Sequence, residues 1–205
     1  MNVNLTLTRS NEIDTGMKNQ KTVCVFCGSS IGKLSAYADA AYELGKALGS
    51  SKINLIYGGG CLGLMGIVAD AAIESGSTVT GVIPNFLQEA EISHNRLHRL
   101  LVTNDMHQRK RLMYSKSDAF ISLPGGVGTF DETMEVITWT TLGLLAKPII
   151  LVNINRYWDP FIALIRHSIT EGFSKSENEN IMTVVDSPNN VISILNGNQK
   201  DLKRE

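Results

Sequence analysis

Several features that define large classes of proteins are missing from this sequence of 205 residues. The formal net charge is only −1 and the pI is about 6.4, so the chain lacks the basic excess typical of a nucleic-acid-binding surface. No apolar run approaches the roughly 20 residues that span a bilayer. Residues 1–20 also contain no apolar segment of the kind that a secretory signal requires. We therefore expect a cytoplasmic protein whose partners include neither nucleic acid nor a membrane.

Cysteine is scarce, and its three residues, an odd number, fit a reducing compartment better than a disulfide framework. Cys24 and Cys27 have the CxxC spacing of redox proteins, but they lie in an apolar run typical of a strand. Residues three apart in a strand point to opposite faces, so the two thiols cannot easily meet. The four histidines have no spacing that suggests a zinc site. Neither a redox centre nor a metal site is predicted.

The common nucleotide-binding motifs are absent or incomplete. No GxxxxGK[ST] sequence is present, which argues against a P-loop ATPase or kinase. Gly58, Gly60 and Gly63 match the GxGxxG fingerprint of dinucleotide-binding folds. That fingerprint also expects an acidic residue at the end of the next strand, where residues 78–84 supply none. The sequence therefore favours a mononucleotide over NAD.

Apolar runs alternate with segments of helical periodicity along the chain. The apolar runs are residues 22–26, 53–57, 78–83, 119–123, 148–152 and 181–185, with a shorter one at 100–103. The helical segments are residues 34–48, 64–74, 105–116, 130–144 and 160–171. Continuous apolar strands between helices indicate a doubly wound, Rossmann-like α/β fold with a parallel sheet covered on both faces. We expect one such domain over residues 21–196, with a flexible extension at 1–20 and a charged tail at 197–205.

Three glycine turns follow predicted strands. The residues expected to approach a ligand there are Gly28 and Ser29 in the first turn, Gly58, Gly59 and Gly60 in the second, and the turn that begins at Pro124. In an open parallel sheet the carboxyl ends of the strands share one edge, and ligands bind there where the strand order reverses. Three glycine turns at one edge predict a nucleotide-sized crevice.

The third turn, Pro124-Gly-Gly-Val-Gly-Thr-Phe-Asp-Glu132, joins a strand to a helix. Backbone N–H groups at such a helix start form a site for an anion such as phosphate. Asp131 and Glu132 would lie in the first helical turn, where a simple phosphate site needs no negative charge, so we expect chemistry beside the phosphate. A structural alternative is a capping box, with Thr129 as N-cap and Glu132 reaching back to it.

A basic segment, residues 105–113, starts another predicted helix. Met106 and Met113 would face the core, and Arg109 borders that buried face. An arginine near the sheet edge offers a planar fork suited to bidentate phosphate binding. For Lys110 and Arg111 the alternative is a solvated basic turn.

The segment Met106-His-Gln-Arg-Lys110, together with the Pro124 turn and residues 135–139, resembles the "Lonely guy" (LOG) family. The resemblance covers about residues 22–173. LOG enzymes activate cytokinins by hydrolysing the N-glycosidic bond of a nucleoside 5′-monophosphate, which releases the free base and ribose 5-phosphate. The resemblance implies a Rossmann-like fold, a homodimer, and no metal or organic cofactor.

The family pattern also assigns roles to individual residues. It implies Arg109 and Glu132 as the catalytic pair. It implies a phosphate cradle made of Gly125, Gly126, Gly128 and Thr129. It also implies that the substrate site is lined by Glu91, Lys110 and Thr138. Val127 stands where tyrosine is common and Asp131 where glutamate is common; both are expected beside the substrate, where they bear on base preference more than on the reaction.

Two functions of different class remain open at this point. Cleavage of a ribosyl C–N bond develops positive charge on the sugar, and the Glu132 carboxylate can stabilise that charge or activate water. A carrier of a nucleotide or phosphorylated cofactor would also need the glycine turns, but not Arg109 and Glu132 together. Relatives labelled as lysine decarboxylases would need pyridoxal phosphate on a lysine, and no lysine here has a setting that favours one.

Overall fold

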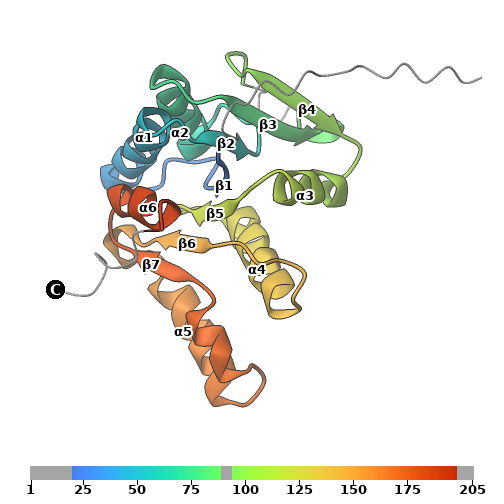
Figure 1. The fold of residues 1–205 in the computed structure, drawn as a ribbon, viewed down its shortest axis with the longest axis vertical. Helices are drawn as coiled ribbons and strands as arrows, with labels where there is room; N and C mark the ends of the chain where they lie inside the picture. Colours follow the sequence, from blue (N-terminus) through green and yellow to red (C-terminus); the bar gives the residue numbers. More distant parts are fainter. Residues whose placement is uncertain (1–19, 89–93, 198–205) are drawn as a thin grey trace, which may run out of the picture.

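The computed structural model describes residues 20–88 and 94–197, and its strands form one parallel sheet (Figure 1). The strand order is β4-β3-β2-β1-β5-β6-β7. The strands are β1 (Thr22–Phe26), β2 (Asn54–Tyr57), β3 (Val79–Pro84), β4 (Arg99–Thr103), β5 (Ala119–Ser122), β6 (Ile149–Val152) and β7 (Thr183–Val185). All seven predicted strands are confirmed to within two residues, as is the Rossmann-like class.

Helices cover both faces of the sheet (Figure 1). One face carries α1 (Ser35–Ser50), α2 (Gly63–Glu74) and α6 (Pro188–Leu195), and the other carries α3 (Met106–Ser115), α4 (Val127–Thr141) and α5 (Asp159–Thr170). Three short 3₁₀ turns are η1 (Asn85–Leu87), η2 (Ile154–Arg156) and η3 (Ser176–Asn180). The five predicted helices are present, whereas α6 and the 3₁₀ turns were not predicted. The described residues include no helix that is both long and apolar enough to cross a bilayer.

Alternate side chains of the strands enter two separate cores. Val23 and Val25 of β1 pack with α1, α2 and α6, whereas Cys24 and Phe26 pack with α3, α4 and α5. Cys27 belongs to the first core and Cys24 to the second, so the two thiols lie on opposite sides of the sheet, as predicted. Burial raises the pKa of both thiols, which keeps them protonated and inert.

The start of α4 differs from the sequence prediction. The helix begins at Val127 with Gly126 as its N-cap, so Thr129 lies inside the first turn and the predicted capping box is wrong. Asp131 and Glu132 lie in the second turn rather than the first. The buried Thr129 side chain fills the space beside Gly125, where an added Cβ would lie 2.1 Å from Oγ1 of Thr129. Because the helix begins at Val127 and Gly126 is the N-cap, Thr129 and Glu132 do not form the capping box.

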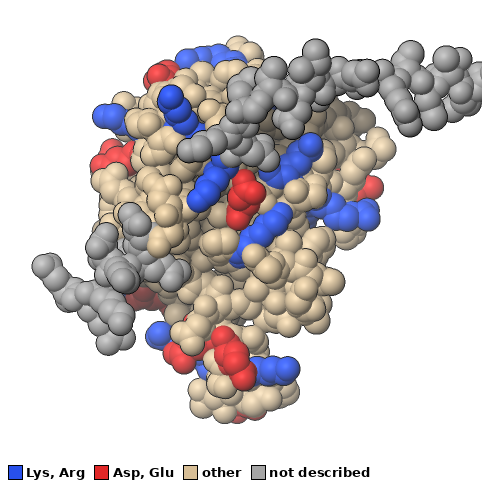
Figure 2. All heavy atoms as spheres, viewed as in Figure 1, with Lys and Arg blue, Asp and Glu red and all other residues tan. Residues whose placement is uncertain are grey.

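Charge is mixed on the surface. On the face shown in Figure 2, Lys and Arg side chains lie among Asp and Glu side chains and form no continuous basic area. This distribution agrees with the near-neutral net charge of the whole chain.

Candidate active site

The sheet reverses its order between β1 and β5, and two glycine turns meet at that point. The Gly28 amide, just after β1, donates a hydrogen bond of 3.1 Å to the carbonyl of Pro124, just after β5. Leu123 donates in the same way to Phe26 at 2.9 Å. A doubly wound sheet opens at its reversal point because adjacent connections run to opposite faces. The first and third glycine turns therefore flank the crevice in which a ligand is expected.

The second glycine turn has a structural task. The Leu64 and Met65 amides at the start of α2 both donate to the Gly28 carbonyl, at 3.0 and 3.3 Å. Gly63 has a φ of +61°, and a Cβ on it would lie 2.3 Å from the backbone of Ser29. The N-terminus of α2 is thus closed by protein, and close backbone packing explains the GxGxxG spacing without a dinucleotide.

The N-terminus of α4 borders a cavity of about 260 Å³. Amides in the first turn of a helix have no partner within the helix, so they are available to an anion at this wall. Nine predicted site residues line the cavity: Gly28, Ser29, Arg109, Gly126, Val127, Gly128, Thr129, Asp131 and Glu132. The other lining residues are Cys27, Met65, Leu87 and Met106. These apolar residues come from four different segments, so no local sequence signal groups them.

Arg109 enters the cavity wall from α3. Its helix starts where the sequence predicts, because Asp105 is the N-cap and its carboxylate accepts from the Gln108 amide at 2.7 Å. Arg109 is only 5% exposed, and its Nη2 donates to the Gly58 carbonyl at 3.3 Å. A Cβ on Gly58 would lie 2.3 Å from that nitrogen, so this glycine makes room for the guanidinium.

Lys110, the next residue of α3, is buried, so the alternative of a solvated turn is wrong for it. Its Nζ contacts Asp131 Oδ2 at 2.7 Å and Glu135 Oε2 at 3.3 Å. Burial lowers the pKa of Lys110, but the two carboxylates of α4 outweigh burial and raise it overall. Glu135 also accepts from the Tyr114 hydroxyl at 2.6 Å. This α3–α4 ion network fixes Arg109 and Glu132, the neighbours of Lys110 and Asp131, relative to each other.

Glu132 faces the carboxyl end of β1. Burial is the main cause of the raised pKa values of Cys24, Cys27 and Tyr114, and the negative charge of Glu132 raises all three further. The carboxylate therefore lies close enough to these buried groups to act on them, and Glu132 also lines the cavity. A carboxylate and a guanidinium from two helices thus share one cavity with an anion-binding helix start.

The remaining predicted residues lie elsewhere. Gly125 lines a neighbouring cavity, and Thr138 is exposed with its hydroxyl bonded to the Met134 carbonyl at 2.8 Å. Lys110 and the glycines of the second turn are not among the residues that line the active-site cavity. In that turn Gly59 has a φ of +85°, and the Gly60 carbonyl accepts from the Tyr57 hydroxyl at 3.1 Å. Glu91 falls outside the described residues.

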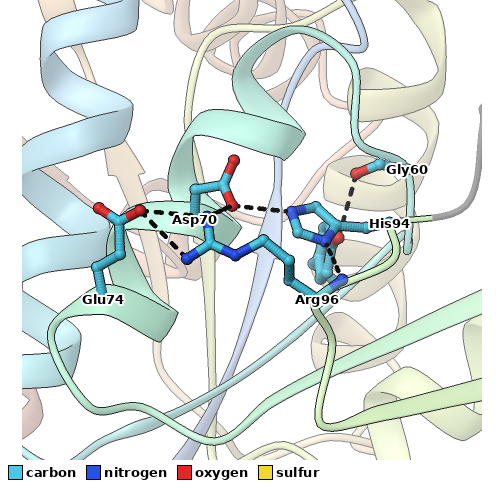
Figure 3. Close-up of polar contacts among 6 residues, drawn as sticks. Gly60, Asp70, Glu74, His94 and Arg96 are labelled. Atoms are coloured by element: carbon cyan, nitrogen blue, oxygen red, sulfur yellow. Dashed lines mark hydrogen bonds and ion pairs between the residues drawn. The ribbon is translucent and has the colours of Figure 1, made fainter.

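A cluster of charged and polar side chains that the sequence did not reveal lies next to the second glycine turn (Figure 3). His94 Nε2 lies 3.2 Å from Asp70 Oδ1, and Arg96 contacts Asp70 at 2.8 Å and Glu74 at 3.2 Å. The His94 amide also donates to the Gly59 carbonyl at 3.1 Å. Asp70 and Glu74 therefore connect α2 to the chain segment before β4.

Comparison with known proteins assigns the family. The family model described as "Possible lysine decarboxylase" matches residues 65–195. A cytokinin riboside 5′-monophosphate phosphoribohydrolase of Rhodococcoides fascians is 50% identical over 75% of this chain and 78% of its own length. The rice (Oryza sativa subsp. japonica) protein named "Probable cytokinin riboside 5′-monophosphate phosphoribohydrolase LOGL2" is 46% identical over 85% of this chain and 72% of its own. The chain belongs to the LOG family.

Solved structures agree on the LOG-type fold. The molybdenum cofactor binding protein of Rippkaea orientalis has a TM-score of 0.67 at 19% identity, covering 88% of this chain and 98% of its own. The Moco carrier protein of Chlamydomonas reinhardtii has a TM-score of 0.65 at 20% identity, covering 89% and 99%. At such identities the likeness establishes the fold alone.

The glycines of the α4 turn yield a prediction. Gly125→Ala should lower the melting temperature by overpacking worth about 1–3 kcal/mol, because its Cβ would meet Thr129 and the Gly28 amide. Gly128→Ala should leave stability unchanged or raised, because no atom lies within 4 Å of its Cβ and alanine favours a helix. The new methyl at the cavity wall should nevertheless weaken binding of a nucleoside monophosphate. Thermal melting of both variants measures the difference in stability, and calorimetric titration measures nucleotide binding. Equal effects of the two substitutions on stability would contradict the prediction.

Proposed function

We propose that this LOG-family protein hydrolyses the N-glycosidic bond of a purine nucleoside 5′-monophosphate to give the free base and ribose 5-phosphate. The observation that supports it is the presence of Arg109 and Glu132 in the cavity that begins at the amides of α4. The relatives that are 46% and 50% identical carry this activity in their names. A cytokinin-activating enzyme takes a substrate with an N6-modified base, and we place the reaction in the cytoplasm.

The phosphate end of the substrate would bind at the first turn of α4. The amides there and the Arg109 guanidinium offer charge-assisted hydrogen bonds to phosphate oxygens. Binding energy at this remote group positions the sugar for reaction. The ribose would then lie along the wall that carries Glu132.

Glu132 is proposed to act at the sugar. As the C1′–N bond breaks, positive charge develops on the ribose, and a nearby carboxylate stabilises it. The same carboxylate can accept a proton from the water that attacks C1′, while the departing base takes up a proton. Met65, Leu87 and Met106 supply an apolar wall of the kind that binds a purine ring.

Two other activities fit the site less well. A carrier would use the anion-binding turn but has no need of Glu132, and its support is a likeness of fold at 19–20% identity. Lysine decarboxylation requires pyridoxal phosphate on an uncharged lysine amine. No lysine is among the described residues that line the cavity, and the raised pKa of Lys110 keeps its amine charged between two carboxylates.

Assembly is proposed to be a homodimer through α3 and α4. Between these helices runs an apolar groove of about 480 Å³ that includes Leu112, Trp139 and Leu145. Leu142 and Leu144, just past the end of α4, are each 66% exposed. A groove beside exposed leucines is a surface that a second copy would cover.

The substrate assignment predicts a strong dependence on the 5′-phosphate. A nucleoside monophosphate should be cleaved with a kcat/KM on the order of 10²-fold or more above that of its nucleoside, because charge-assisted hydrogen bonds are lost without phosphate. The measurement is base release from a panel of purine monophosphates and their matching nucleosides. Equal rates on both members of each pair would refute the assignment.

The role of Glu132 predicts a large loss of turnover on Glu132→Gln. Removing the charge should lower kcat by roughly 10² to 10⁴, the usual range for such a group. The melting temperature should change little, because Glu132 has no capping role. Asp131→Asn is the matched control: it keeps an oxygen near Lys110 and should cost far less turnover. A lowered melting temperature with near-normal turnover for Glu132→Gln would instead favour a carrier.

The dimer predicts a solution mass of twice 22.4 kDa by light scattering at micromolar concentration. Leu144→Glu should shift the protein toward the monomer, because it places a charge in the proposed apolar interface. Tyr42→Glu on the exposed side of α1, across the sheet, should not change the mass. A monomeric wild-type protein would contradict the proposal.

A further inference from the structure

The hydroxyl of Tyr157 donates a hydrogen bond to the carbonyl of Gly125, in the turn before α4. Tyr157 follows β6 and is 32 residues away in sequence. It does not line the candidate active site. It lines a neighbouring cavity of about 270 Å³ together with Tyr37, Leu64 and Gly125, and this cavity shares Gly28, Ser29 and Gly126 with the candidate active site. A residue outside the site thus contacts the backbone of the anion-binding turn.

The geometry of the peptide bond gives this contact a consequence. The peptide that joins Gly125 to Gly126 is trans, so its C=O and N–H groups point in opposite directions. Because Tyr157 binds the carbonyl on its own side, the Gly126 N–H points away from Tyr157. Gly126 lines both cavities, whereas Gly125 lines only the Tyr157 side. The Gly126 N–H is therefore on the side of the peptide away from Tyr157, in a residue that also lines the active-site cavity.

Tyr157 is itself fixed by an unusual backbone turn. Asn155 and Arg156, directly before it, have φ values of 48° and 60°, in the left-handed region that residues other than glycine rarely adopt. The Asn153 side chain stabilises the turn through both its NH2 group and its carbonyl oxygen. It donates to Asp159 at 2.8 Å and accepts from the Trp158 amide at 2.7 Å. Such a conformation persists where surrounding contacts determine it, and it is common at functional sites.

The ring of Tyr157 is held as firmly as its backbone. It packs edge-on against Tyr37 of α1 at 5.7 Å and stacks on Phe130 of α4 at 6.3 Å. Phe130 follows Thr129 in the first turns of α4, so the ring contacts the same helix whose N-terminus faces the ligand. Burial raises the pKa of Tyr157, which keeps its hydroxyl a donor at neutral pH.

We propose that Tyr157 is a positioning residue that directs the Gly126 amide at the 5′-phosphate of the substrate. This inference rests on the proposed function. It adds a residue of the β6–α5 connection to the machinery that distinguishes a monophosphate from a nucleoside. Tyr157 acts through the backbone of Gly125 and Gly126 and does not touch the substrate.

The test is Tyr157→Phe, which removes the hydroxyl and keeps the ring packing. One uncharged hydrogen bond is lost, so kcat/KM for the monophosphate should fall about 3- to 10-fold, mainly through KM. Hydrolysis of the matching nucleoside should be unchanged, because it has no phosphate for Gly126 to bind. Tyr42→Phe, at a half-exposed tyrosine of α1, is the control and should leave both rates unchanged.

The outcomes separate this inference from the proposed function. If the wild-type protein shows no preference for monophosphates, the proposed function fails first. If the wild type prefers them and Tyr157→Phe has the same preference ratio, the function stands and the role of Tyr157 is refuted. A variant that loses both activities equally, with a lowered melting temperature, assigns Tyr157 a structural role only and also overturns the inference. Titration with ribose 5-phosphate gives an independent reading, in which Tyr157→Phe should bind about 3- to 10-fold more weakly.

Discussion

The hydrogen bonds of Gly28 decide which helix N-terminus at this edge of the sheet keeps its backbone amides available to a ligand. Its carbonyl accepts from two amides at the start of α2, and its amide donates to Pro124 before α4. One residue therefore closes the N-terminus of α2 with protein and ties the first glycine turn to the third. A Cβ on Gly28 would lie 3.0 Å from the Ser30 carbonyl and 3.3 Å from the Gly125 Cα, which is tight on both sides. Because the α2 amides are already used, the anion-binding capacity of this sheet edge is concentrated at α4.

The ion network between α3 and α4 complements that arrangement. Lys110 brings one buried positive charge to Asp131 and Glu135, and each of the two helices places a catalytic candidate directly beside this contact. The Lys110 side chain is buried but that of Asp131 is 55% exposed, so desolvation of the lysine and solvent screening at the aspartate both limit the network's net gain in stability. Its main effect is geometric: it sets the relative position of Arg109 and Glu132. That geometry matters for the proposed function, in which the guanidinium binds the phosphate while the carboxylate acts at the sugar.

The sequence predicts those parts of the structure that depend on local pattern. Parallel strands are continuous apolar runs even in the largely exposed edge strand β4, so all seven were located. Asp105 marks the start of α3 because capping is a contact within four residues. The start of α4 was misplaced because the Thr129–Glu132 pattern matches a capping box, whereas the helix starts two residues before Thr129, at Val127, and packs Thr129 against Gly125. The contacts of Lys110 with α4, of His94 with Asp70 and of Tyr157 with Gly125 span 21 residues or more. No periodicity or propensity signal encodes such distances.

The two departures from the common LOG pattern lie at the wall of the cavity. Val127 is 82% exposed at the first residue of α4, so the change from tyrosine alters the rim of the cavity and not the backbone amides proposed to bind the phosphate. Asp131 is one methylene shorter than glutamate, yet its carboxylate reaches Lys110 at 2.7 Å and preserves the contact between α3 and α4. The shorter side chain leaves more room at the wall that Asp131 shares with Glu132. Variation at both positions therefore reshapes the entrance and one wall of the cavity, while the proposed phosphate-binding turn and the proposed Arg109–Glu132 pair stay in place.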